Sequence, residues 1–442
     1  MKTPATPPDY FEEFISASKV LGGNLASVLR QSALDSYDPW DKFRHQIPPA
    51  GLTISQWWGI VRLQRVNNAI PVALKQQSGE PFWYCLPPLI SRECYFLSQK
   101  LSSLDTTISA YQRHKFIYNG LTDEAIYSAQ LEGASTSRRV ARQLLEQNRE
   151  PRDLSERMIV NNYLAMENLQ DLLGVKATPD FIKELHRTVT EGTLDIESDV
   201  GKIQSDQNDR VKIFGDSEQI IYVPPPAREL PARMEALCDF INEPEPWMHP
   251  LLKAMVVHFM VGYDHYFADG NGRTARSLFY WMLLKAGFPA ARFLVVSALL
   301  KEAPAQYARA FLNVEYDGGD LTYFLIYQLK ILRRAVEHLE KYLADDRRQA
   351  AEIKEGLKDR ADLNNRQIDI LLESRGEPET LWTAQMVADR FRVSRPSGHG
   401  DLSALEEMGF LRRGRKGRRV VWRVVPGWEK WLSSGSGDDL DS

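Results

Sequence analysis

The sequence predicts a mainly α-helical protein with one short β-hairpin in its middle and a smaller helical module near its C-terminus. Two apolar runs, 255–261 and 278–284, are long and apolar enough to form buried helices. Two β-rich runs within 211–223 flank Gly215-Asp216, a pattern typical of a hairpin. After residue 363, short helical patterns precede a basic stretch that resembles a second hairpin.

Length and composition set broad limits on the kind of protein. The 442 residues are enough for two or three domains, and a hydrophobic content of 43% allows a full core. The net charge of −4 gives no global argument for nucleic acid or an anionic membrane, and no apolar run reaches transmembrane length. Cys85, Cys94 and Cys238 lack metal-ligand spacing and are interpreted as core or free thiols. We therefore expect a cytoplasmic protein without a membrane partner.

A twelve-residue stretch between the two apolar runs combines several groups that suit phosphate chemistry. His265 can accept a proton near neutral pH, and Asp269 is a hard oxygen ligand fit for Mg²⁺. The residues 270–272 predict a turn, after which a helix begins near Gly272 with its N–H groups available to an anion. Arg273 and Arg276 are three residues apart on that helix, so they share one face and can hold phosphate oxygens.

The same residues, in the same order, form a known family signature. From His265 through Phe267, Asp269 and Gly270-Asn271-Gly272-Arg273 to Arg276, the stretch resembles the Fic pattern His-x-Phe-x-Asp/Glu-Gly-Asn-Gly-Arg-x-x-Arg at every defined position. Tyr266 stands where Pro is commoner. The resemblance implies the Fic helical-bundle fold and a protein adenylyltransferase, which moves AMP from ATP to a Tyr, Ser or Thr hydroxyl of a target protein or of itself.

The resemblance also implies a role for each signature residue. His265 would deprotonate the target hydroxyl, and Asp269 would hold Mg²⁺ on the nucleotide phosphates. Gly270, Asn271 and Gly272 would form the anion hole. Arg273 and Arg276 would clamp the β- and γ-phosphates. Phe267 would pack inward and fix the loop.

A helix near 122–133 carries a second motif of the family. Thr122 can cap it, acids occupy its first turn, and Gly133 can end it. Ser128 and Glu132 are four residues apart and share one face. An ordinary capped helix is one interpretation. The resemblance implies another, because Ser/Thr-x-x-x-Glu-Gly/Asn marks an inhibitory helix whose Glu reaches the second motif Arg and blocks the γ-phosphate.

Two further segments bear on target binding. In the Fic family the hairpin at 211–223 is a flap whose edge pairs with the target backbone, which here would involve Ile220, Ile221 and Tyr222. The alternative is a hairpin that has no role in target binding. Many family members also carry Gly-x-x-Arg before the flap, whereas this chain has Gly201-Lys202-Ile203-Gln204 and lacks the Arg. The departure puts the local contact of that Arg in doubt.

The domain organisation follows from these patterns. We expect an N-terminal helical extension at 1–84, a Fic domain at 85–335, a connecting helix at 336–362, a winged-helix-like domain at 363–432 and a disordered tail at 433–442. Residues 390–423 include ten basic and three acidic residues, which is a local excess of seven positive charges. Pro396, Gly398 and Gly400 are a poor match to a continuous recognition helix. The module is therefore a DNA-binding or a protein-docking module.

The first hypothesis is thus a Fic-type adenylyltransferase with ATP as substrate, Mg²⁺ as cofactor and a built-in inhibitor. Removal of AMP from the same target, with Glu132 helping to activate water, is a branch of this hypothesis. The rival is a DNA-linked regulator whose catalytic site is vestigial, against which the complete signature argues. The sequence leaves open the identity of the target protein, the use of a nucleotide donor other than ATP, and the formation of a homodimer.

Overall fold

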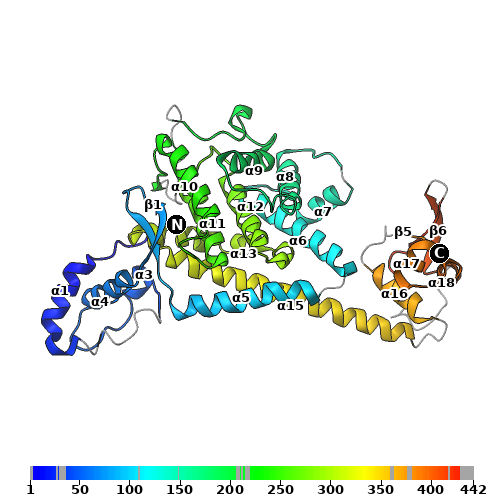
Figure 1. The fold of residues 1–442 in the computed structure, drawn as a ribbon, viewed down its shortest axis with the longest axis horizontal. Helices are drawn as coiled ribbons and strands as arrows, with labels where there is room; N and C mark the ends of the chain where they lie inside the picture. Colours follow the sequence, from blue (N-terminus) through cyan, green and yellow to red (C-terminus); the bar gives the residue numbers. More distant parts are fainter. Residues whose placement is uncertain are drawn as a thin grey trace. The chain divides into compact units, whose positions relative to one another are not determined.

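The computed structural model describes residues 3–25, 28, 36–107, 110–147, 149–205, 210, 213–214, 220–358, 363–375, 381–416 and 419–428. The chain forms two compact units, one of residues 1–109 and 113–338 and the other of 110–112 and 339–442 (Figure 1). No helix in these described ranges combines the length and the apolar composition needed to cross a membrane.

The first unit is built mainly of helices, which confirms the predicted fold class. Its N-terminal elements are α1 (Tyr10–Leu21), η1 (Gly22–Asn24), α3 (Trp40–Phe43), α4 (Ile54–Asn67), β1 (Ile70–Lys75), β2 (Pro81–Tyr84), α5 (Pro88–Thr107) and α6 (Ala110–Leu131, whose first three residues belong to the second unit). The central elements are α7 (Arg138–Glu146), α8 (Leu154–Asn168), α9 (Pro179–Thr190), η2 (Glu197–Asp199), β3 (Ile213–Phe214), β4 (Ile220–Tyr222), η3 (Ala227–Glu229) and α10 (Leu230–Asn242). The last are α11 (Pro250–Asp264), α12 (Asn271–Lys285), η4 (Pro289–Phe293), α13 (Val296–Glu302), α14 (Pro304–Tyr316) and α15 (Thr322–Lys358, shared with the second unit).

The two helices beside the signature form the centre of this unit. Almost every residue of α11 and α12 is buried, as their apolar runs predicted. Pro250 begins α11, where its missing N–H costs no helical hydrogen bond. Gly270 precedes α12 with φ +79°, a left-handed conformation that glycine adopts without strain. The loop between the helices is therefore fixed at both ends by core elements.

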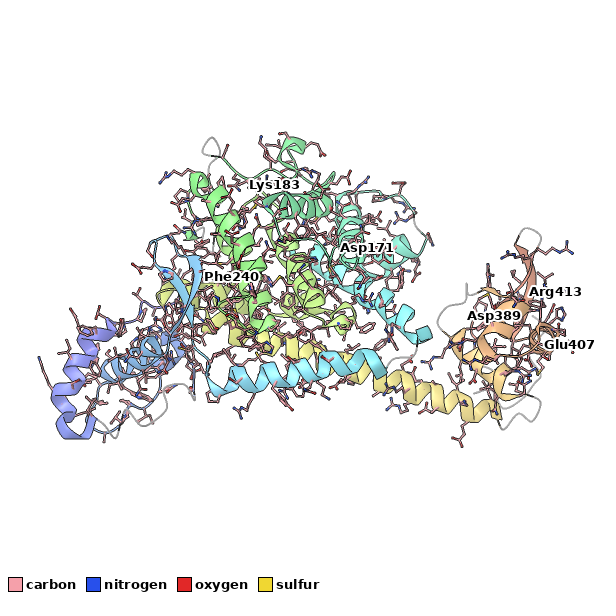
Figure 2. The ribbon with its side chains drawn as sticks, viewed as in Figure 1. Asp171, Lys183, Phe240, Asp389, Glu407 and Arg413 are labelled. Atoms are coloured by element: carbon pink, nitrogen blue, oxygen red, sulfur yellow. The ribbon has the colours of Figure 1, made fainter. Side chains whose placement is uncertain are left out.

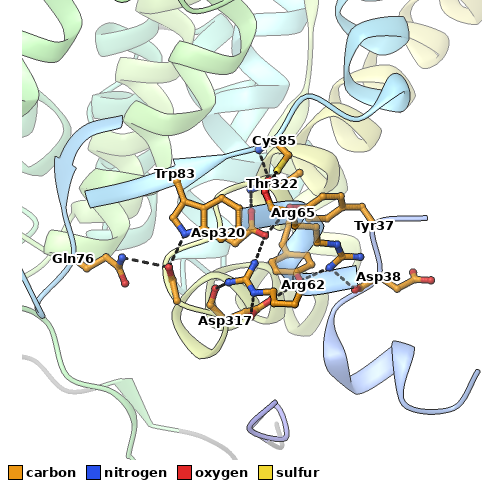
Figure 3. A network of polar contacts seen from close by, with 12 residues as sticks. Tyr37, Asp38, Arg62, Arg65, Gln76, Trp83, Cys85, Asp317, Asp320 and Thr322 are labelled. Carbon is orange, nitrogen blue, oxygen red and sulfur yellow. Dashed lines mark hydrogen bonds and ion pairs between the residues drawn. The ribbon is translucent and has the colours of Figure 1, made fainter. Parts of the chain in front are cut away.

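A buried polar network ties the N-terminal helix α4 to the loop before α15 (Figure 3). Arg62 Nε lies 2.9 Å from Asp317 Oδ1, and Arg62 Nη1 lies 3.0 Å from Asp320 Oδ2. The fully buried Arg65 donates to the Tyr323 hydroxyl at 2.9 Å. Burying a charge is costly unless it is paired, so these ion pairs fix the N-terminal segment on the core.

Two antiparallel hairpins belong to the first unit. β3 and β4 pair, with Ile213 opposite Tyr222, so the described part of the segment 211–223 is a hairpin. Residues 211–212 and 215–219 lie outside the described residues, as do the side chains of Ile220 and Ile221. The second hairpin, β1 with β2, lies inside the segment 1–84 that we expected to be helical. Its strands are buried on one face through Val72, Leu74, Phe82 and Tyr84.

The predicted start of the helix near 122–133 is wrong. The helix α6 begins at Ala110 rather than after Thr122, and Thr122 is buried in its middle with no partner for its hydroxyl among the described residues. The upstream turns continue because they pack tightly on the core. A Cβ on Gly120 would come within 2.7 Å of Arg292 O, and Phe116 and Leu121 are buried. The predicted end is correct, since Gly133 follows the helix with φ +95°.

The second unit contains the end of α15, then α16 (Asn365–Glu373), β5 (Leu381–Trp382), α17 (Ala384–Phe391), α18 (Arg395–Glu407), β6 (Leu411–Lys416) and β7 (Arg419–Val424). The strands form an antiparallel sheet in the order β5-β7-β6, and the predicted basic hairpin is β6 with β7. Figure 2 labels Arg413 on β6. Trp382, Trp422 and Trp428 are buried in the core of this unit.

The expectation that Pro396, Gly398 and Gly400 interrupt the third helix of this unit is wrong. The helix α18 starts at Arg395, capped by the Ser394 hydroxyl, which accepts from Ser397 N at 3.2 Å. Pro396 falls in the first turn, where a proline is tolerated. A Cβ on Gly398 would lie 2.7 Å from Ala384 O. Close packing of α18 on α17 therefore requires a glycine there.

Candidate active site

His265 ends α11 in a strained backbone conformation. Its φ of +49° and ψ of +59° are left-handed, which is unusual for a residue with a side chain. Its Nδ1 lies 3.4 Å from Gly262 O, an atom that can only accept, so Nδ1 carries the proton. The Nε2 atom is then an unprotonated acceptor, with no hydrogen-bond partner among the described residues. Burial is the largest of the effects that act on the pKa of His265. It lowers this pKa and so favours the neutral form.

The loop after His265 is held by its own side chains. The Asn271 amide closes it, accepting from Phe267 N at 3.0 Å and donating to Phe267 O at 2.7 Å. Because its side chain is used in this way, Asn271 can meet an anion only through its backbone N–H. Phe267 is fully buried and packs inward, as the resemblance implied.

His186 supports the loop, and no sequence pattern pointed to this residue. Its ring stacks on Phe267 with centroids 3.7 Å apart. Gly201 N donates to His186 Nδ1 at 3.0 Å, so Nε2 carries the proton and donates to Asp269 O at 2.9 Å. A Cβ on Gly270 would collide with Thr190 and approach His186 Nε2. The first glycine of the signature is therefore required by this close approach.

Arg273 is buried beside Asp269. Its Nη1 donates to Val189 O at 2.8 Å and to Thr193 Oγ1 at 3.2 Å, and its Nη2 donates to Asp269 Oδ2 at 3.2 Å. The Asp269 side chain is 59% exposed, so its carboxylate has access to solvent beside this guanidinium.

Arg276 joins Ser128 and Glu132 to the signature. Its Nη2 donates to Glu132 Oε1 at 2.8 Å and to Ser128 O at 3.0 Å, and its Nε donates to Ser128 Oγ at 2.9 Å. A Cβ on Gly272 would collide with Glu132 Oε1, so this carboxylate lies against the first turn of α12. That turn has the free N–H groups that suit an anion.

Two residues beside the loop explain the tyrosine in the place of the commoner proline. The buried Tyr266 hydroxyl donates to Asp264 Oδ2 at 2.7 Å, and Arg233 lies 3.2 Å from Asp264 Oδ1. Burial raises the pKa of Asp264 to about 6, against the opposing effects of Tyr266 and Arg233. A proline at this position would leave one oxygen of a buried carboxylate without its donor.

The other predicted residues lie where they can play only limited roles. His258 is a buried, hydrogen-bonded core histidine, with Nε2 2.7 Å from the Tyr307 hydroxyl. The Tyr222 side chain is buried and donates to Tyr263 O at 2.8 Å, so Tyr222 can offer a target only its backbone. Among the described residues, no group of three or more His, Cys, Asp or Glu side chains could hold a metal ion by itself.

Comparisons with known proteins identify the domain that contains this site. Residues 176–283 match the family model described as Fic/DOC family, so the chain carries a Fic/DOC domain. The chain is 36% identical over 113 residues to "Protein adenylyltransferase Fic" of Nematostella vectensis, a stretch that covers 25% of this chain and 24% of that protein. It is 35% identical over 109 residues to the protein of the same name in Drosophila willistoni, covering 24% and 20%. The match thus spans a quarter or less of these relatives.

A solved structure shares the fold over more of the chain. The structure of a Fic family protein from Desulfovibrio desulfuricans aligns with a TM-score of 0.51 and 18% identity, covering 78% of this chain and 98% of that chain. At this identity the likeness concerns the fold, which is that of Fic proteins.

Proposed function

We propose that this protein is an adenylyltransferase that moves AMP from ATP to a Tyr, Ser or Thr hydroxyl of a protein, itself included. The observation that carries the proposal is the placement of an unprotonated His265 Nε2 in the loop that leads into the N-terminus of α12, which also carries Arg273 and Arg276. The named relatives, each covered over a quarter or less of its own length, support the same activity.

The residues suggest how the reaction runs. The acceptor hydroxyl attacks the α-phosphorus and gives its proton to His265 Nε2, a new O–P bond forms, and the bond from the α-phosphorus to the bridging oxygen breaks, releasing pyrophosphate. Neutral imidazole is the form that accepts this proton, and burial keeps His265 in that form. The N–H groups at the start of α12 and the two guanidiniums hold the phosphates in line.

A magnesium ion fits this arrangement. Mg²⁺ usually takes one or two carboxylates and completes its shell with waters and substrate phosphates, so a single exposed carboxylate suffices. Asp269 offers that carboxylate. Bound there, the ion would neutralise part of the triphosphate charge.

We infer that Glu132 inhibits transfer. Its carboxylate uses Arg276 Nη2 and lies against the first turn of α12, both of which a γ-phosphate would need. The phosphates of ATP bound beside Glu132 would lie out of position for in-line attack. A misplacement of about 1 Å can cost on the order of 10²-fold in rate. Hydrolytic removal of AMP, with Glu132 activating water, is an alternative use of the same carboxylate.

The test is self-modification with ATP labelled at the α-phosphate, confirmed by intact mass. Glu132→Gly should raise the rate by at least tenfold, whereas Glu302→Gly, which removes a surface carboxylate paired with Arg334, should leave it unchanged. His265→Ala in the Glu132→Gly background should lower the rate by about 10²–10⁴-fold while ATP still binds. No label on any variant, with folded protein and bound ATP, would support the vestigial-site alternative.

A second function is favoured by the charge of the second unit. Arg395, Arg412, Arg413, Arg415 and Arg419 are exposed and have no carboxylate partner among the described residues. Thr383, Gln385 and His399 line a groove together with Arg395 and Arg419. We propose that this winged-helix-like unit binds duplex DNA through these arginines, which we call the arginine surface.

A further inference from the structure

The strained loop at His265 is held by two residues that the family signature does not include. Gln204 N donates to Tyr266 O at 2.9 Å, and Gln204 Nε2 donates to Phe267 O at 2.7 Å. Gln204 stands where many members of the resembled family have arginine, so an amide replaces a guanidinium at this point of the chain.

A guanidinium is nevertheless present, and it comes from six residues downstream. Arg210 Nη1 donates to Gln204 Oε1 at 2.5 Å, and Arg210 Nη2 donates to Asp264 O at 2.6 Å and to His265 O at 3.0 Å. Together the pair binds four consecutive carbonyl oxygens, those of residues 264–267. A chain segment bonded at every carbonyl has little freedom to relax.

We propose that Gln204 and Arg210 act as one positioning unit that holds His265 in its reactive orientation, with Arg210 supplying the charge missing at position 204. This inference rests on the proposed role of His265 as the base.

Two physical reasons support the proposal. A left-handed residue with a side chain is unfavourable and persists only where its surroundings fix it. His265 is such a residue, and the bonds of Arg210 are made at its own carbonyl and at the preceding one. In addition, the positive charge of Arg210 lowers the pKa of His265, whereas Glu132 and Asp269 raise it. Burial is the largest cause of the lowered pKa of His265, and Arg210 adds to it while its bonds hold the backbone at His265.

The experiment uses the full chain in the Glu132→Gly background, so that inhibition does not mask the effect. Arg210→Met should lower kcat about 10- to 100-fold with the KM for ATP within twofold, because the phosphate ligands are untouched. It should also move the acidic limb of the pH–rate profile to higher pH, since the pKa of His265 rises. Arg210→Lys keeps the charge but cannot hold two acceptors as a fork, so it should lower kcat and leave the acidic limb in place.

Two further variants make the test sharper. Gln204→Arg should recover part of the rate lost in Arg210→Met, because residue 204 already reaches Phe267 O. Arg348→Met, which removes a surface arginine paired with Asp345, is the control for loss of one charge and should change nothing. A kcat for Arg210→Met within threefold of its parent, or equal losses with the control, would overturn the proposal.

A readout independent of transfer separates this proposal from the proposed function. NMR titration of isotope-labelled histidine, with His265 assigned through His265→Asn, should show the pKa of His265 raised by Arg210→Met. If Glu132→Gly transfers no AMP but this shift is seen, the positioning unit stands and the proposed activity fails. An unshifted His265 in folded Arg210→Met contradicts the positioning unit whatever the activity.

Discussion

At the scale of single residues, burial keeps three histidines around the signature neutral, and their partners give them different tasks. His265 has a free Nε2 and can take a proton. His186 uses both ring nitrogens to join Gly201 and Asp269, and burial lowers its pKa to about 4. Among the described residues, His258 forms a hydrogen bond only with Tyr307, and burial lowers its pKa to about 3. Protonation of the last two would place an unpaired charge in the core.

This burial predicts acid sensitivity. The pKa of His186 is about 4 in the folded chain and about 6.5 in an unfolded one, so the unfolded state binds the extra proton first as pH falls. The stability that neutral His186 contributes is present above pH 6.5 and is lost as pH falls toward 4. His186→Gln should therefore have a lower free energy of unfolding than wild type at pH 7. The difference between the two should be about 2 kcal/mol smaller at pH 5.

Urea unfolding followed by tryptophan fluorescence at the two pH values measures this gap. The exposed His45 gives a control, and His45→Gln should track wild type at both. A gap for His186→Gln that stays constant from pH 7 to pH 5 would show that His186 is not held neutral in the fold.

The residues of the site divide into those that the sequence could identify and those that it could not. The signature from His265 to Arg276 and the pair Ser128 and Glu132 were identified because each motif is contiguous in the chain. The ion pair between Arg276 and Glu132, at 2.8 Å, brings the two motifs together. His186 and Arg210 were missed because they bind backbone atoms of a loop far away in sequence, which leaves no local pattern. Gln204 was noted only as a departure from Gly-x-x-Arg, and its contacts with the same loop could not be predicted.

At the scale of elements, close packing overrode local helix signals in two places. Thr122 is a good cap by type, yet α6 continues through it because Gly120 packs against η4. Gly398 and Gly400 are poor helix formers, yet α18 continues through both. Sequence periodicity predicted that these helices exist, but their boundaries depend on contacts made elsewhere.

The two glycines of α18 give a matched pair for a test of this packing. Gly398→Ala should destabilise the second unit, because its Cβ would meet Ala384 O at 2.7 Å and Val387 Cβ at 3.1 Å. Gly400→Ala has open space around its Cβ and should stabilise the helix by about 0.5–1 kcal/mol. Thermal unfolding of the two variants in the full chain measures both effects. Similar shifts for both would mean that the close approach of α17 and α18 is not required for folding.

At the scale of the whole molecule, the two compact units carry the two proposed functions separately. The signature, Ser128 and Glu132 belong to the first unit, and the arginine surface belongs to the second. The sequence placed the division near 336–363, and the second unit begins at Leu339 within the continuous helix α15. A connecting helix was expected at 336–362, whereas α15 spans Thr322–Lys358, and the point of division within it depends on contacts that periodicity does not report.

Because the signature and the arginine surface belong to separate units, we expect that the arginine surface can be altered without loss of AMP transfer. Replacing Arg412, Arg413 and Arg415 with glutamine removes three exposed charges from β6, on which no residue of the signature lies. In the Glu132→Gly background, self-modification should stay within twofold of its parent. Affinity for duplex DNA should fall to a similar degree for unrelated sequences, because phosphate contacts carry no sequence information.

The salt dependence distinguishes phosphate contacts from other effects. Each lost phosphate contact reduces the magnitude of the slope of log K against log salt by about 0.9. The slope of the triple variant should therefore be smaller in magnitude than that of its parent by between two and three. Fluorescence anisotropy with a labelled duplex at several salt concentrations measures it. The control replaces Arg334, Arg347 and Arg348 of α15 with glutamine, which changes the net charge equally and should leave the slope intact. If wild type binds no duplex at low salt, or if both triple variants lose the same slope, the arginine surface does not bind DNA, and a protein-docking role for this unit is favoured.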